Sequence, residues 1–111
     1  MKQIIITLLF ITSGLISSAG NIDTASFEVS GICNMCKDRI ENAAYIKGVK
    51  KATWDKETQM LTVIFKPNKV TVQQIAASVA EAGHDNAYVT CTEEQYLKVH
   101  NCCRYRENEV H

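Results

Sequence analysis

Apolar residues alternate with polar ones in some segments of this chain and recur at helical spacing in others, and the order of these segments leaves few folds open. Two-residue alternation is typical of half-buried strands. The four expected strands are residues 25–30, 50–55, 60–65 and 86–91. Helical spacing runs from about Asn34 to Gly48 and again over residues 71–83, where Thr71 and Gln74 form a capping box. The expected order is strand, helix, strand, strand, helix, strand.

This order predicts an α+β fold of the ferredoxin-like βαββαβ type, with two helices on one face of a four-stranded antiparallel sheet. Residues 24–91 are expected to form this domain, and a stretch of about 68 residues can bury one modest core without disulfides. Residues 92–111 follow it, and the capping box of Thr92 and Gln95 predicts a short C-terminal helical extension.

The first nineteen residues differ from the rest. An uncharged apolar run from Ile4 to Ile16 follows a positive charge and precedes the small residues Ser17 and Ala19. This pattern is typical of a cleaved signal peptide over residues 1–19. A transmembrane anchor is the alternative, but the run is shorter than the roughly 20 residues that span a bilayer. The mature chain is therefore expected to be periplasmic or secreted, without membrane insertion after cleavage.

The charge balance excludes several function classes. Twelve Lys and Arg offset twelve Asp and Glu, so the composition indicates no nucleic-acid partner. The sequence also lacks paired carboxylates, a nucleophile motif and a phosphate-binding loop, and we do not expect an enzyme. The functional signal must therefore be local.

The cysteines provide that signal. Five follow the leader: Cys33, Cys36, Cys91, Cys102 and Cys103. An odd number in an exported chain cannot all pair within one molecule. In the expected topology Cys33 lies on the loop after the first strand and Cys36 in the first turn of the helix, where the helix dipole stabilises thiolates. Two thiolates without oxygen ligands select soft ions, Cu(I) first, with Hg(II), Cd(II) or Zn(II) if further ligands join.

The same Cys-x-x-Cys spacing permits two other functions. The first is a thiol-disulfide redox protein, for which such a pair near a helix start is also typical. ICNMCK, however, has neither an aromatic residue before the pair nor a proline within it, and Pro67, the only proline, is expected in a turn. The second alternative is a disulfide-bonded interaction module without metal, which would contain no free thiols.

Three stretches carry a resemblance to a known family: the loop from Gly31 to Cys36, RIENAAYIKGVKKATWD leading into the hairpin, and AEAGHDN after the second helix. Through them residues 25 to about 91 resemble the heavy-metal-associated domain family of copper chaperones, amino-terminal domains of metal-transporting P-type ATPases and the periplasmic mercury-binding protein. The resemblance implies one soft ion held by Cys33 and Cys36 and passed by thiolate exchange to a metal-transporting membrane protein or another metal carrier. A monomer and a metal-bridged dimer are both open.

The chain departs from the family pattern at two places. Only Ile32 separates Gly31 from the first cysteine, where family members commonly have two residues, one of them a methionine packed beneath the loop. Ile32 is expected to supply the buried anchor, and Met35 to be exposed. His84 occupies a loop position where the family often has an aromatic residue or lysine, so it can serve as a third ligand or a pH-sensitive gate.

The extension adds a second group of soft ligands, since His100, Cys102 and Cys103 fall within four positions. Adjacent cysteines rarely bond to each other, because the bridge strains the backbone. We expect the extension to bring Cys102 or Cys103 to the first cysteine pair, giving a three- or four-coordinate site. The alternative is a disulfide from Cys91 or a tail cysteine to another chain member. Cys91 itself is expected to be buried packing.

Overall fold

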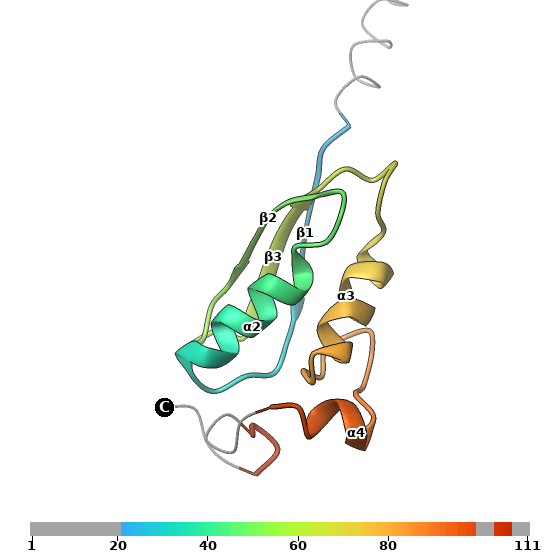
Figure 1. The fold of residues 1–111 in the computed structure, drawn as a ribbon. Coiled ribbons are helices and arrows are strands. Elements are labelled where there is room, and N and C mark those ends of the chain that lie inside the picture. Colours follow the sequence, from blue (N-terminus) through green and yellow to red (C-terminus); the bar gives the residue numbers. More distant parts are fainter. Residues whose placement is uncertain (1–20, 100–103, 108–111) are drawn as a thin grey trace, which may run out of the picture.

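The computed structural model describes residues 21–99 and 104–107 (Figure 1). Its elements are β1 (Asp23–Glu28), α2 (Asn34–Ala44), β2 (Val49–Trp54), β3 (Met60–Phe65), α3 (Val72–Glu81) and α4 (Glu93–Tyr96). The strands form one antiparallel sheet in the order β1-β3-β2, and α2 and α3 lie together on one face of it (Figure 1). This arrangement confirms the expected α+β, ferredoxin-like fold class.

The helices form where the sequence predicts them, because their ends are specified locally. The Thr71 hydroxyl accepts a hydrogen bond from the Gln74 amide, and the Gln74 side chain accepts one from the Thr71 amide, so the predicted capping box is present at the start of α3. Apolar side chains of both helices then pack on the sheet. The core contains Phe27, Val29, Ile40, Trp54, Leu61, Val63, Phe65, Ile75 and Val79.

The last expected strand is reduced to a single antiparallel bridge between Val29 and Asn86. The Asn86 side chain explains the difference. Its Oδ1 accepts hydrogen bonds from the backbone amides of Tyr88, at 3.1 Å, and Val89, at 3.0 Å. The backbone amide of Asn86 in turn donates to the Val89 carbonyl at 2.9 Å. An asparagine that hydrogen-bonds to the backbone two residues ahead favours a turn. The chain therefore curls away from β1 instead of continuing beside it.

The extension packs against the domain. Its helix α4 begins with the predicted capping box of Thr92 and Gln95, and Val99 after it is almost fully buried. The contact is close at Gly83, which has a left-handed φ of +106°, and where an added Cβ would lie 2.5 Å from the Gln95 carbonyl oxygen. Residues 1–19, Cys102 and Cys103 lie outside the described residues. Within the described part of the chain, no helix has the length and apolar character to cross a bilayer.

Trp54, the largest fully buried side chain among the described residues, joins the end of β2 to the loop after β1. Its indole N–H donates to the Val29 carbonyl at 2.9 Å. Its ring lies against Gly31, where a Cβ would approach within 2.9 Å. The backbone of Trp54 is tied to α2, because its amide donates to the Glu41 carboxylate at 2.8 Å and its carbonyl accepts from Lys37 at 2.9 Å. One residue thus fixes strand, loop and helix together.

We predict that Trp54→Phe destabilises the protein by about 1–3 kcal/mol, because the buried Val29 carbonyl loses its donor and the smaller ring leaves space under the loop. Urea unfolding of the two proteins measures the difference. Tyr45→Phe, at a side chain that is 62% exposed, is the control and should change the free energy of unfolding by less than about 0.5 kcal/mol. Equal effects of the two substitutions would contradict this role of Trp54.

Candidate metal centre

Cys33 and Cys36 lie at the start of α2, as the sequence predicts. Cys33 is the N-cap residue, with extended backbone at φ −149° and ψ 175°, and Cys36 is in the first turn. Both are buried, and their Sγ atoms are 3.5 Å apart. A disulfide requires about 2.05 Å, so the two sulfurs are not bonded to each other. An ion with metal–sulfur bonds of about 2.3 Å can bridge such a separation.

Cys33 is nevertheless disulfide-bonded. Cys36 is too distant for such a bond, at 3.5 Å, and Cys91 is a free thiol. A sulfur in a disulfide carries no negative charge to donate to a metal ion, since the thiolate is the ligand form of cysteine. Metal binding by both cysteines therefore requires reduction of this disulfide, which takes up two electrons.

The loop before the cysteines is fixed by contacts with Gln59 and Trp54. The Gly31 amide donates to the Gln59 side-chain oxygen at 3.0 Å, and its α-carbon lies so close to the Trp54 ring that a Cβ would have no room. Ile32 is 3% exposed and supplies the expected apolar anchor, whereas Met35 is 45% exposed. The shortened loop thus keeps its cysteines in place with isoleucine instead of methionine beneath it.

Two basic residues of α2 are committed to structural contacts. The Lys37 ammonium donates to the Glu41 carboxylate and to the Trp54 carbonyl. The Arg39 guanidinium donates to the Ala82 carbonyl at the end of α3. A cation next to helix carbonyl groups at a C-terminus is favourable. These contacts attach α2 to β2 and to the end of α3.

His84 is completely buried beside the cysteine loop. Its Nδ1 lies 2.8 Å from the Ser30 carbonyl oxygen, and since a carbonyl only accepts, Nδ1 carries the proton and Nε2 keeps its lone pair. Within the described residues Nε2 has no hydrogen-bond partner. Burial lowers the pKa of His84 from 6.5 to about 4, despite the Ser30 hydrogen bond that favours the proton. The imidazole is therefore neutral at pH 7.

The C-terminal residues Tyr105 and Arg106 clamp the loop that carries His84. The Tyr105 hydroxyl donates to the Gly83 carbonyl at 2.6 Å and accepts from the Asp85 amide at 2.8 Å. Arg106 donates two hydrogen bonds to the Asp85 carboxylate, at 2.8 and 2.9 Å. Partial burial alone would raise the pKa of Asp85, but the hydrogen bonds from Arg106 and from the Cys91 amide lower it. Tyr105 also stacks on the His84 ring at 5.5 Å.

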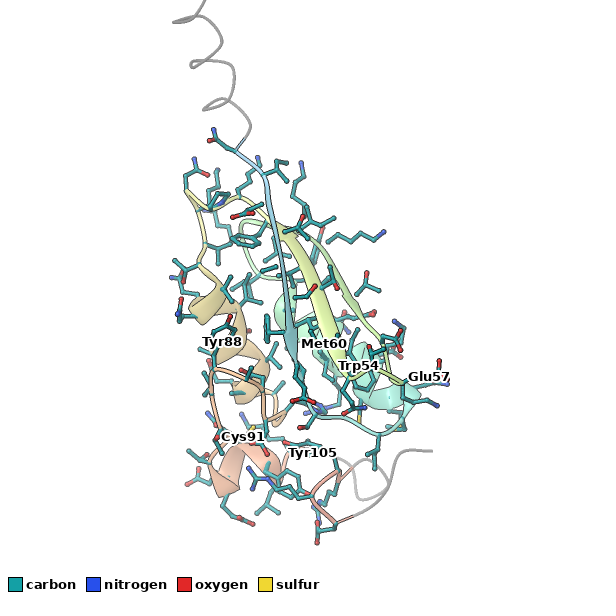
Figure 2. All side chains as sticks on the ribbon, turned by 180° about the vertical axis from the view of Figure 1, so that it is seen from behind. Trp54, Glu57, Met60, Tyr88, Cys91 and Tyr105 are labelled. Carbon is teal, nitrogen blue, oxygen red and sulfur yellow. The ribbon has the colours of Figure 1, made fainter. Side chains whose placement is uncertain are left out.

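Cys91 belongs to this contact and not to the cysteine pair. Its Sγ lies 3.8 Å from the Tyr105 hydroxyl, and Figure 2 shows both side chains near α4. Burial raises the pKa of the Cys91 thiol to about 11. A thiol with so high a pKa is a poor source of thiolate, which agrees with the packing role expected for it.

The described part of the chain places no group of three or more His, Cys, Asp or Glu side chains around one point. Among the described residues the candidate centre therefore consists of the cysteine pair. His84 lies on the adjacent loop, where its ring is hydrogen-bonded to the Ser30 carbonyl. The expected tail ligands Cys102 and Cys103 lie outside the described residues. Tyr105, Arg106 and Asp85 were not predicted, because no motif or spacing in the sequence relates the extension to this loop.

Residues 26–85 match the heavy-metal-associated domain family. The match includes both cysteines of the pair and His84, and it spans just over half of the chain. The chain therefore belongs to this family of heavy-metal-binding domains, which are generally carriers and not enzymes. A search of curated protein sequences finds no match.

Three solved structures illustrate the similarity. The CopZ metallochaperone is 28% identical with a TM-score of 0.56, over 59% of this chain and 100% of CopZ. Oxidized MerP from Ralstonia metallidurans is 28% identical with a TM-score of 0.56, over 60% of this chain and 94% of MerP. The N-terminal domain of the zinc(II) ATPase ZiaA is 32% identical with a TM-score of 0.52, over 60% of this chain and 64% of that chain.

The buried His84 predicts a pH dependence of stability. Its pKa is lowered from 6.5 to about 4 on folding, so below pH 6.5 the unfolded chain binds a proton that the folded chain does not. Stability should fall as the pH drops from about 6.5 to about 4, by at most about 1.4 kcal/mol per pH unit. Urea unfolding at pH 7, 6 and 5 measures this slope. His84→Gln should flatten it, and an unchanged slope would contradict the assignment.

Proposed function

We propose that this protein carries one soft metal ion outside the cytoplasm, held by the thiolates of Cys33 and Cys36. The observation that supports this most is the 3.5 Å separation of the two sulfurs at the start of α2. The helix N-terminus stabilises negative charge there, and burial excludes competing water. Two soft thiolates favour Cu(I) above other ions, with Hg(II), Zn(II) and Cd(II) as further candidates. The relation to a metallochaperone supports a carrier role.

The proposed carrier works by ligand exchange and performs no catalysis. A thiolate of a partner replaces one cysteine of the pair at the ion, and the ion passes across without leaving sulfur ligands. A metal-transporting membrane protein or a second metal carrier fits this role, and the relation to an ATPase metal domain supports the first. The carrier itself is a monomer, or a dimer in which one ion joins two cysteine pairs. No nucleic-acid partner is proposed.

Export is proposed from residues 1–19, which have the pattern of a cleaved leader. A periplasmic or secreted location exposes thiols to oxidation, and the disulfide of Cys33 is consistent with that chemistry. Reduction to two thiols would precede metal binding, so the oxidised form would be a resting state of the carrier.

A thiol-disulfide redox protein is the second candidate, and one observation favours it. The Cys36 sulfur lies 3.5 Å from the sulfur of Cys33, which is itself disulfide-bonded. A Cys36 thiolate could attack that sulfur and release the partner thiol. One observation is against this candidate. Thioredoxin-type enzymes place a cis-proline beside the cysteine pair, whereas the described residues contain no cis peptide bond.

His84 is proposed as an additional ligand. Its Nε2 is neutral and keeps its lone pair, as a metal-bound imidazole requires. Because the described residues form no three-ligand group, Nε2 and the cysteine pair would have to move closer together, and the hydrogen bond of Nδ1 to Ser30 could remain. The imidazole would then convert the two-sulfur site into a three-coordinate one, which favours Zn(II) over ions that two thiolates satisfy.

The tail cysteines are proposed to reach the same centre. Cys102 and Cys103 are the remaining cysteines of the chain once Cys36 and Cys91 are set aside as partners of Cys33. The chain on either side of them is anchored, since Val99 is buried and the Arg104 side chain donates to the Val99 carbonyl at 3.3 Å. This anchoring supports a tail cysteine as disulfide partner in the oxidised form and as ligand in the reduced form.

The metal-carrier proposal predicts that the reduced protein binds one Cu(I), and that Cys33→Ser with Cys36→Ser binds none. Native mass spectrometry of the exported protein, offered Cu(I), Zn(II) and Hg(II) in turn, measures this and shows whether residues 1–19 have been removed. Cys91→Ser is the matched control and should still bind one ion. If the reduced wild type binds no ion, the carrier proposal fails and the redox candidate takes its place.

The tail proposal predicts that Cys102→Ser with Cys103→Ser lowers metal affinity by roughly tenfold or more, because the ion loses a coordinating or orienting group. Competition with a chelator of known affinity measures the change. In the unreduced protein, the same substitution should leave Cys33 open to thiol alkylation, whereas Cys91→Ser should not. Unchanged affinity together with an unchanged disulfide would refute the proposal.

A further inference from the structure

Four lysines line a pocket at the end of the domain that lies away from the cysteine pair. The pocket has a volume of about 260 Å³, and Lys47, Lys50, Lys66 and Lys69 surround it with Tyr45 and Gly48. It lies between the turn that joins α2 to β2 and the turn that joins β3 to α3. Asp23 at the start of β1 pairs with Phe65 at this end of the sheet, whereas the cysteine loop follows the other end of β1 (Figure 1).

No acidic residue lines this pocket. In the described part of the chain the ion pairs are Lys37 with Glu41 and Arg106 with Asp85, and neither involves a lysine of the pocket. Four ammonium groups around one hollow repel one another. The arrangement is therefore more favourable with an anion among them than without one.

The backbone that carries the lysines is fixed. Gly48 has a left-handed φ of +99°, and a Cβ there would lie 2.9 Å from a Val70 methyl group, so the two turns are in close contact. The Lys66 amide donates to the Gly48 carbonyl at 2.8 Å, and the Lys66 carbonyl accepts from the amides of Lys69 and Val70 at 2.9 and 3.1 Å. The hollow is thus present before any ligand arrives, which lowers the entropy lost on binding.

A bulge in β2 adds one of the four charges. Val49 pairs with Phe65 and Lys51 with Ile64, so Lys50 is the extra residue between them. A bulge changes the direction in which a strand presents its side chains. Lys50 lines both this pocket and a neighbouring one, and Tyr45, 62% exposed, contributes to both as well.

We propose that this pocket binds a phosphate group. Lysine ammonium groups are common phosphate ligands and act as point charges without a fixed geometry, which suits four flexible side chains on two rigid turns. The phosphate can belong to an anionic lipid headgroup or to a soluble ion.

The experiment compares two variants with the same change in net charge. Lys47→Gln with Lys69→Gln removes two lysines of the pocket, and Lys56→Gln with Lys98→Gln removes two from elsewhere. The full chain of each is titrated with inorganic phosphate and followed by amide NMR, and is sedimented with vesicles of pure phosphatidylcholine or with added phosphatidylglycerol. Unchanged spectra away from the substituted positions verify that each variant folds.

We expect phosphate to shift the amides of residues 47–50 and 66–70, and anionic vesicles to bind more protein than neutral ones. The pocket variant should lose roughly 30-fold in affinity for the anionic vesicles at low salt, and the control variant much less. Preference for vesicles identifies a headgroup, and phosphate shifts without vesicle preference identify a soluble ion. The proposal is overturned if neither probe binds, or if both variants lose affinity equally, since that result reflects net charge alone.

Discussion

The contact of Trp54 with the loop after β1 is the interaction on which the metal centre depends. The ring fills the space beneath Gly31, and its N–H satisfies the buried carbonyl of Val29. The backbone of the same residue is bound by Glu41 and Lys37 of α2. The two cysteines lie where this loop joins this helix. Because Trp54 contacts both the loop and the helix, it fixes the positions of the two cysteines relative to each other. The geometry of the site therefore depends on the packing of the core beneath it.

Most of the fold could be predicted from the sequence, because its elements are specified by nearby residues. The alternation of Leu61, Val63 and Phe65 identified β3, and Thr71 with Gln74 identified the start of α3. The last strand could not be predicted correctly by periodicity. The chain turns at Asn86, because the side chain of Asn86 hydrogen-bonds to the backbone of the residues that follow it. The spacing of apolar residues carries no information about such a hydrogen bond.

The candidate site was predictable to a lesser extent. A spacing of three residues at a helix start is a local signal, and it located Cys33 and Cys36 correctly at the beginning of α2. The contacts around His84 join positions twenty or more residues apart, as with Arg106 and Asp85, and no local pattern in the sequence indicates them. The lysine pocket was missed for a similar reason. A balanced total charge says nothing about lysines that two separate turns bring together.

The close approach at Gly83 has a consequence for the redesign of this domain. A Cβ at Gly83 would lie 2.5 Å from the Gln95 carbonyl oxygen, so the loop and the extension are closely packed against each other. The boundary of the family match at residue 85 therefore cuts through a packed interface and not through a linker. A domain trimmed at that boundary would uncover His84, so a transferable unit has to keep the part of the extension that packs on Gly83 and His84.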